Sequence, residues 1–306
     1  MQRGISYAAL AYVLWGLFPL YFAGLHGVPA LEILGHRIAW SLLFLFGLLA
    51  LRGGFGWLGP ALRNPALLRS FGASALLLAA NWFIYIWAIG QGRVIEASLG
   101  YFITPLANVL TGRLVLKEKL STGQWLAVAL ATAGVAWMSL RLGAPPWIAL
   151  ALATSFSIYG YLRKTAPLGA LEGLTLETLA LAPFALVGLG WTLWAGSNAF
   201  AAAPALQQGL LVGVGPLTAI PLLLFAAGAR RIPMAVLGML QYIGPSIGML
   251  LGVFWFHEAF GGARAQGIVI IWAGCAVFSA DLLLRQHAAR RADARAAAAA
   301  TAASPS

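Results

Sequence analysis

Charged residues are scarce in this chain. Of its 306 residues, 9% are Asp, Glu, Lys or Arg, whereas a soluble domain has roughly 25%. Hydrophobic residues make up 61% of the chain, and the mean hydropathy is +0.86. So few polar groups cannot cover a folded surface in water. The composition therefore excludes an ordinary soluble domain and indicates an integral membrane protein.

The residue patterns of common enzymes are also missing. Cys275 is the single cysteine, which excludes an intrachain disulfide and a cysteine metal cluster. His257-Glu258 lacks the second histidine of a zinc protease. Asp281 and Asp293 lie in or near the C-terminal tail and do not resemble a paired Mg²⁺ site. With no Walker motif either, the sequence predicts no enzyme, no metal and no cofactor.

Ten long apolar stretches are present. Each is near the roughly 20 residues that a helix needs to cross a bilayer. They do not alternate apolar and polar residues as the strands of a membrane barrel do, so we predict an all-α integral membrane fold. The first is too long for a signal peptide, and we interpret it as an uncleaved helix. The ranges are 4–25, 30–51, 67–90, 94–116, 123–141, 145–163, 171–195, 205–229, 232–256 and 263–284.

The basic residues indicate an orientation. With a cytoplasmic N-terminus, fifteen of the 19 Lys and Arg residues flank the cytoplasmic ends of the stretches, three flank the outer ends, and Arg37 lies inside a stretch. Positive charge accumulates on the cytoplasmic side of membrane proteins, so both termini are predicted to be cytoplasmic. Because the charges lie at segment ends rather than in one patch, the net charge of +11 does not indicate a nucleic-acid partner. The cytoplasmic set is Arg3, Arg52, Arg63, Arg69, Arg113, Lys117, Lys119, Arg163, Lys164, Arg230, Arg231, Arg285, Arg290, Arg291 and Arg295.

The sequence matches itself when shifted by 140 residues. Pro105 and Glu118 fall on Pro245 and Glu258 without a gap. Each repeat holds five predicted helices, and an odd number inverts the second repeat across the membrane. Inverted repeats are typical of secondary transporters with alternating access, although a duplication kept only for folding is the alternative.

The predicted organisation follows from this repeat. Residues 1–141 form the first five-helix repeat and 142–284 the second, inverted one. Residues 285–306, rich in Ala and Arg, are expected to be a disordered, basic cytoplasmic tail.

Charged residues inside the spans are the first candidates for a site. Arg37 and Glu177 occupy equivalent positions of the two repeats with opposite charges. They could form a buried ion pair, or Arg37 could bind an anionic group of a substrate while Glu177 binds a proton or a cationic group. His36 could relay protons, because its unperturbed pKa is near 6.5, or it could pack between helices.

Aromatic and amide residues inside the spans predict a cavity for an amphipathic ligand. Pro105 and Pro245 are expected to kink their helices and free backbone carbonyls, which must face protein or a water-filled cavity. With Arg37, the candidate substrate-binding residues are Trp15, Asn81, Trp82, Tyr85, Tyr101, Asn108, Gln241 and Tyr242.

Other residues are expected to be structural. Glu118 and Glu258 follow the fourth and ninth predicted helices, and we expect charge clusters at helix ends there, with gating as the alternative. The fifth and tenth predicted helices are rich in Gly, Ala and Ser, which favours close packing or a homodimer interface.

Several of these segments resemble the RarD branch of the EamA-type drug/metabolite transporters. The resemblance covers the chain except the tail and is most specific in 96–108 and at His36-Arg37. It implies ten helices in two inverted repeats, the bacterial inner membrane and transport of small solutes. The family label "chloramphenicol-sensitive protein" implies a link to that drug without assigning a substrate. The matching segments are Trp15–Phe22, Glu32–Arg37, Asn81-Trp82, Glu96–Ile103 and Gln241–Pro245.

We therefore predict a secondary transporter, an exporter coupled to protons through Glu177, Glu96 or His36. Its expected partners are a small-molecule substrate, protons and the lipid bilayer. A facilitator, exchanger or channel without proton coupling is the alternative. An intramembrane enzyme, with His36 as base for Ser157, is a weaker one.

Overall fold

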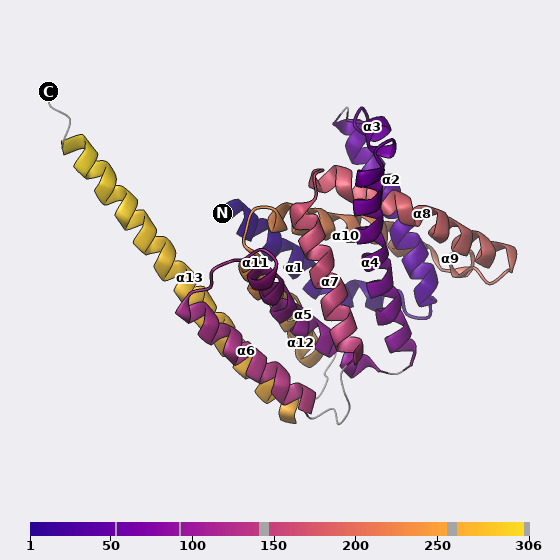
Figure 1. The fold of residues 1–306 in the computed structure, drawn as a ribbon. Coiled ribbons are helices and arrows are strands. Elements are labelled where there is room, and N and C mark those ends of the chain that lie inside the picture. The colour runs from indigo at the N-terminus through magenta and orange to yellow at the C-terminus, as the bar shows by residue number, and fades with distance from the viewer. Residues whose placement is uncertain (53, 92, 141–146, 256–261, 303–306) are drawn as a thin grey trace. The chain divides into compact units, whose positions relative to one another are not determined.

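The computed structural model describes residues 1–52, 54–91, 93–140, 147–255 and 262–302, and within these ranges the chain is helical with no strand (Figure 1). Helices suit an apolar chain because they satisfy every backbone hydrogen bond internally. The helices are α1 (Gln2–Ala23), α2 (Ala30–Leu51), α3 (Leu58–Leu62), α4 (Pro65–Gly90), α5 (Val94–Leu114), α6 (Thr122–Leu140), α7 (Trp147–Thr165), α8 (Ala170–Trp194), α9 (Ala199–Ala202), α10 (Ala205–Ala229), α11 (Met234–Gln241), α12 (Ile243–Phe254) and α13 (Gly262–Ala302).

Every predicted apolar range overlaps a helix, and residues 141, 145, 146 and 256 of these ranges lie outside the described residues. The ranges 30–51 and 205–229 coincide with α2 and α10 at both ends. The ninth range is interrupted at Tyr242, which separates α11 from α12. In the described part of the chain, eight helical segments are long and apolar enough to cross a membrane; α5 and α7, which carry more polar residues, are not among them. Ten spans therefore stay a prediction.

Proline sets several helix starts. Pro29, Pro204 and Pro233 directly precede α2, α10 and α11, and Pro65 is the first residue of α4. Proline fits this position because its fixed φ suits the first turn, where a backbone N–H lacks a helical partner in any case. At α4 the side chain of Asn64 accepts hydrogen bonds from the next turn, at Ala66 N (3.0 Å) and Leu67 N (3.2 Å).

The helix starts recur at a spacing of 140 residues. Helices α2, α4, α5 and α6 begin at residues 30, 65, 94 and 122, and α8, α10, α11 and α13 begin at 170, 205, 234 and 262. Three of these equivalent pairs pack directly against each other: α2 with α8, α5 with α11 and α6 with α13.

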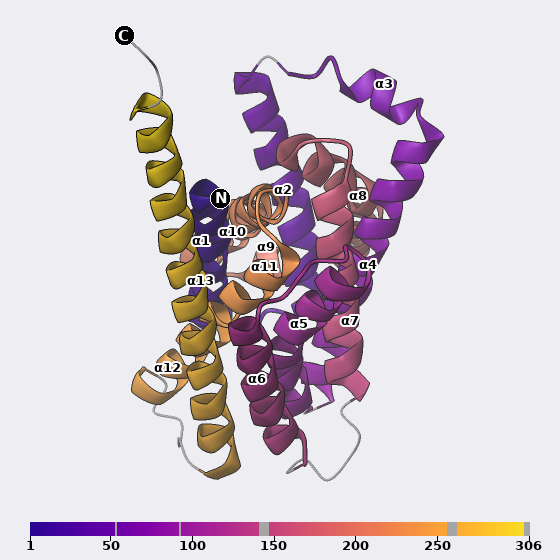
Figure 2. The same cartoon turned by 60° about the vertical axis from the view of Figure 1, so that its left-hand side comes forward.

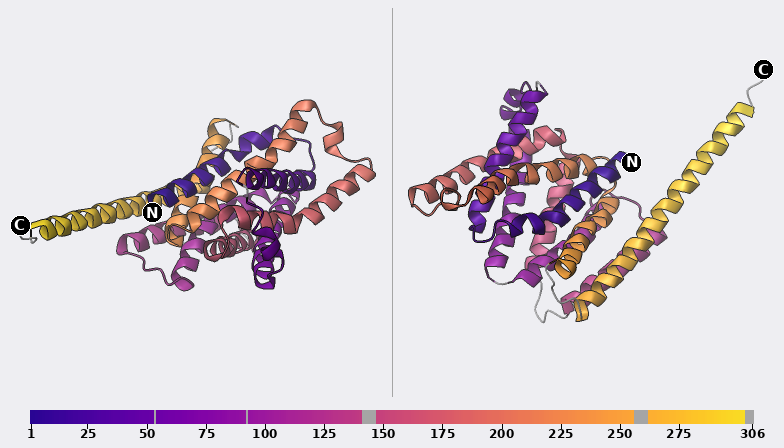
Figure 3. Two further views of the ribbon diagram at one scale, coloured as in Figure 1. Left: turned by 90° about the horizontal axis from the view of Figure 1, so that it is seen from above. Right: turned by 180° about the vertical axis from the view of Figure 1, so that it is seen from behind.

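The chain separates into two compact units that do not coincide with the two predicted repeats. The larger unit, residues 1–118 and 146–259, contains the first helices of both halves of the sequence (Figure 2). In it α10 packs against α1 and α2, α4 packs against α7 and α8, and α5 packs against α7 and α11. The short helix α9 lies in the turn between α8 and α10 (Figure 3).

The smaller unit, residues 119–145 and 260–306, consists of α6 and α13, which lie side by side (Figures 1 and 2). A Cβ on Gly134 would lie 2.6 Å from the carbonyl oxygen of Gly267, so the small residues of these helices serve their mutual packing. Ser121 Oγ donates to Asp281 Oδ2 at 2.7 Å. Helix α13 extends beyond α6 to Ala302, so residues 285–302 of the expected disordered tail are helical, and residues 303–306 lie outside the described residues (Figure 3).

Glu118 caps a helix that is distant in sequence. Its carboxylate accepts hydrogen bonds from Met234 N (2.7 Å) and Ala235 N (3.1 Å), the first backbone donors of α11. A carboxylate there satisfies orphan donors and complements the helix dipole. Its repeat equivalent, Glu258, lies outside the described residues.

Glu118→Ala should lower the stability of the purified protein by about 0.5–2 kcal/mol, the usual effect of losing an N-terminal cap. Glu118→Gln should lose less, because its amide oxygen still accepts one bond. Thermal unfolding in detergent measures both, with Lys119→Ala, an exposed neighbour, as the control. A loss in Lys119→Ala equal to that in Glu118→Ala would contradict a capping role.

Candidate functional site

One small cavity lies among α2, α4, α8 and α10, and thus between helices from both halves of the sequence. Its volume is ≈ 10 Å³, about the least that holds one water molecule. Charged and aromatic side chains face apolar ones across it. The lining residues are Arg37, Ile38, Ser41, Leu78, Trp82, Leu174, Glu177, Thr178, Leu181, Thr218, Ala219 and Leu222.

Ten of these twelve lining residues form five pairs that are 140 positions apart. The two sides of the cavity thus use matching positions along the two halves of the sequence. The chemistry of each pair nevertheless differs, so the two walls of the cavity are not equivalent. The pairs are Arg37 with Glu177, Ile38 with Thr178, Ser41 with Leu181, Leu78 with Thr218 and Trp82 with Leu222.

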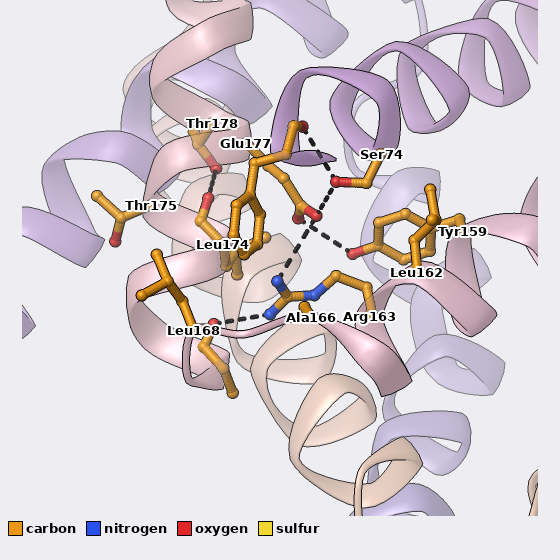
Figure 4. Close-up of polar contacts among 12 residues, drawn as sticks. Ser74, Tyr159, Leu162, Arg163, Ala166, Leu168, Leu174, Thr175, Glu177 and Thr178 are labelled. Carbon is orange, nitrogen blue, oxygen red and sulfur yellow. Dashed lines mark hydrogen bonds and ion pairs between the residues drawn. The ribbon is translucent and has the colours of Figure 1, made fainter. Parts of the chain in front are cut away.

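Glu177 is fully enclosed by polar partners (Figure 4). Its side chain is 1% exposed. Ser74 Oγ donates to Oε1 at 2.5 Å and Tyr159 Oη donates to Oε2 at 3.4 Å. The Arg163 guanidinium, also 1% exposed, lies with Nη1 3.7 Å from Oε1. The charge of Glu177 is therefore balanced within the protein.

Arg37 has no such balance. Its Nε donates to Thr218 Oγ1 at 3.1 Å, and its guanidinium carbon lies 4.6 Å from the ring centre of Trp82, within cation–π range. The phenol side chains of Tyr85 and Tyr101 lie near the guanidinium. Its two terminal nitrogens have no hydrogen-bond partner among the described residues.

Arg37 and Glu177 thus lie at the same cavity without forming the ion pair considered from the sequence. The cation beside Glu177 is Arg163, which the basic-residue pattern placed at a cytoplasmic helix end. It lies in the last turn of α7, and its side chain is buried. The sequence signal was ambiguous, because a basic residue in the last turn of an apolar helix looks the same whether it faces water or folds back.

An aromatic cluster adjoins Glu177. Trp15 packs on Phe156 and Phe225, with ring centres 5.9 and 5.7 Å apart. Tyr159, a hydrogen-bond partner of Glu177, stacks on Phe225 at 6.1 Å. Trp15 therefore lies in a cluster that ends at the cavity carboxylate.

Tyr85 and Tyr101 form a second aromatic contact, edge to face at 5.8 Å. Tyr101 is 47% exposed although it lies inside a helix. Both rings lie near Arg37 rather than at a helix end, so they extend the aromatic surface that Trp82 begins.

Two predicted proton carriers lie away from the cavity. Nδ1 of His36 accepts from Trp40 Nε1 at 3.1 Å, and its ring lies 5.1 Å from that of Phe200. Glu96, in the first turn of α5, pairs with Arg93 at 2.7 Å. Neither lines the cavity, so of the three candidates Glu177 alone does.

The predicted amide residues bind within the protein. Asn81 Nδ2 donates to Leu152 O and Ser155 Oγ, both at 2.9 Å. Asn108, fully buried, donates from Nδ2 to Gln241 Oε1 at 2.6 Å and joins α5 to α11. These contacts support helix packing, and none of the three residues lines the cavity.

The predicted kinks differ from each other. Helix α5 continues through Pro105. The break at Tyr242 lies three residues before Pro245, which has no backbone N–H to donate to the preceding turn. Tyr242 Oη donates to the carbonyl oxygen of Phe102, its repeat equivalent, at 3.2 Å.

Comparisons with known proteins agree with one family. Residues 2–140 match the profile of the EamA-like transporter family. An uncharacterized transporter of Pseudomonas aeruginosa is 44% identical over 286 residues, which cover 92% of this chain and 94% of that protein. Protein RarD of Streptomyces exfoliatus is 42% identical over 298 residues, covering 96% of this chain and 92% of that protein.

A solved structure described as "Crystal structure of protein" has the same fold. It superposes with a TM-score of 0.69 at 23% identity and covers 92% of this chain and 98% of its own. At this identity the likeness concerns the fold alone.

Proposed function

Because this chain belongs to the RarD branch of the EamA-like transporter family, we propose that it is a secondary transporter that exports small molecules by alternating access. The multi-pass membrane character follows from the family and from the apolar helices. The proposal adds ten spans in two inverted repeats, the bacterial inner membrane, and both termini in the cytoplasm.

The observation that carries the proposal is the cavity lined by five residue pairs 140 positions apart. Two inverted repeats can exchange conformations about the axis that relates them, so that one site opens alternately to either side. The recurring helix starts and the packing of α2 on α8 and α5 on α11 support the same relation between the halves.

Glu177 is the proposed proton-coupling residue. It lines the cavity, and its carboxylate is held by three groups that a proton would disturb: Ser74, Tyr159 and Arg163. An ionisable residue deep in a membrane protein is a candidate for a proton pathway because its burial is unfavourable without a function.

The test is charge movement in proteoliposomes adsorbed on a solid-supported membrane. Amino acids, organic anions, small cations and amphipathic drugs are applied to the wild type and to Glu177→Gln. We expect a saturable, pH-dependent current with at least one class of solute. In Glu177→Gln this current should be reduced about tenfold or more, a factor that corresponds to about 1.4 kcal/mol.

The outcomes separate the parts of the proposal. A current that persists in Glu177→Gln keeps transport and makes that carboxylate a structural partner of Arg163. A saturable flux without pH dependence favours a facilitator or exchanger. Silence with every class, in well-folded protein, contradicts electrogenic transport of these solutes.

A further inference from the structure

The charges around the cavity do not cancel. Three ionisable side chains define its polar region: the half-buried Arg37 and the buried Glu177 and Arg163. Arg163 balances Glu177, so the sum is one unpaired positive charge, on Arg37. An isolated charge inside a membrane protein is unfavourable and normally marks the place where a ligand or ion of opposite charge binds.

The repeat explains why this asymmetry exists. The position equivalent to Arg163 in the first half is Ala23, which carries no charge. The positions equivalent to Ser74 and Tyr159, the other partners of Glu177, are Val214 and Pro19. The first half therefore has a charged residue at its cavity without the three side chains that satisfy its counterpart in the second half.

The other carboxylates near these helices are engaged or distant. Glu32 accepts from Ala199 N at 2.8 Å and caps α9. Glu96 binds Arg93, and Glu118 caps α11. Glu172 lies in the first turn of α8 and does not line the cavity. No carboxylate among the described residues is placed to balance Arg37.

The geometry at Arg37 suits an anion. Arg37 Nε donates to Thr218 and its guanidinium lies over the Trp82 ring, while its terminal nitrogens have no hydrogen-bond partner in the part of the chain that the structure describes. A guanidinium fixed in this way matches the two oxygens of a carboxylate with parallel hydrogen bonds. Leu78, Leu181 and Leu222 form an apolar wall for the rest of the molecule.

We propose that Arg37 binds the carboxylate of a small monocarboxylate with an apolar body, in a state of the transport cycle in which α2, α4, α8 and α10 separate and widen the cavity beyond its present ≈ 10 Å³. This deepens the proposed transport function and names its substrate class. An amine is disfavoured because Glu177 is already paired with Arg163, and a zwitterion is disfavoured because its ammonium group would meet a region whose net charge is positive.

Four compounds with the same phenylpropyl skeleton test whether the site prefers an anion over a neutral molecule, a cation and a zwitterion. They are 3-phenylpropionate, 3-phenylpropionamide, 3-phenylpropylamine and L-phenylalanine. Each is titrated calorimetrically into the purified full chain in detergent. We expect 3-phenylpropionate to bind at least about tenfold more tightly than the other three, because hydrogen bonds to charged groups are the stronger ones. Equal or tighter binding of the amine or the amino acid, or no binding of 3-phenylpropionate, would overturn the proposal.

Variants assign the effect to Arg37. Arg37→Gln should lose the preference for the anion, and Arg37→Lys should retain part of it as a point charge. Arg69→Gln, which removes an exposed positive charge on α4, should leave it unchanged. A loss of the preference in Arg69→Gln as large as in Arg37→Gln would overturn the assignment.

Uptake of the same probes into proteoliposomes separates this inference from the proposed function. Binding that depends on Arg37 without uptake supports the anion site and contradicts transport of this class. Saturable uptake of the amine in preference to the acid supports transport and overturns the anion site.

Discussion

Replacing Arg163 with leucine should destabilise the protein by about 3–5 kcal/mol, the largest effect expected for a single substitution. The substitution leaves Glu177, 1% exposed, without its cation, while Ser74 and Tyr159 satisfy only part of the carboxylate. A buried charge without a partner is far less favourable than a pair that is absent altogether.

The double variant Arg163→Leu/Glu177→Leu should therefore recover most of the lost stability. The stability of the single and the double variant is measured by heating the purified protein and determining the fraction that stays monodisperse on size exclusion. Arg69→Leu removes an exposed arginine and should change stability by less than about 0.5 kcal/mol. A double variant no more stable than Arg163→Leu would show that the two residues do not act as a pair.

Gly215→Ala should be the second strongest change, because α10 contacts the backbone of α2 at this residue. A Cβ there would lie 2.4 Å from the carbonyl carbon of Trp40 and 2.7 Å from Ser41 N. Ser41 Oγ also donates to the Gly215 carbonyl at 2.9 Å. Because backbone atoms cannot rotate away, the two helices must separate, and overpacking of this kind destabilises by about 1–3 kcal/mol.

Gly209→Ala is the matched control in the same helix. A Cβ at Gly209 meets no atom within 4 Å, so alanine should be neutral or stabilising by up to about 1 kcal/mol through its higher helix propensity. Thermal unfolding compares the two, and transport should fall only in Gly215→Ala, since Ser41 lines the cavity. Equal stability of both variants would contradict close packing of α2 and α10.

Much of the fold was predictable because the bilayer constrains length and polarity so strongly. A segment that crosses it must be apolar over a fixed distance, so the apolar ranges located the helices within a few residues. Pro29, Pro65, Pro204 and Pro233 lie at the starts of α2, α4, α10 and α11, a signal that the predicted ranges 67–90 and 232–256 did not use. The split at Tyr242 was not resolved, because α11 and α12 form one continuous apolar range.

The candidate site was predictable in part. Arg37, Trp82 and Glu177 were selected because polar or aromatic groups inside an apolar span are rarely accidental, and all three line the cavity. Asn81, Asn108 and Gln241 met the same criterion but bind other helices. An amide inside a span has the same sequence signature whether it binds a ligand or a neighbouring helix.

Composition and periodicity along the chain are enough to predict the helical membrane fold, the spacing of 140 residues and the matching positions of Arg37 and Glu177. The pairing of the charges follows instead from contacts between helices that are far apart in sequence. Arg163 balances Glu177 because α7 and α8 fold against α4, and Glu118 caps α11 because α5 packs beside it. The partner of a buried charged side chain depends on which helices pack beside it, and these distances cannot be obtained from composition or periodicity.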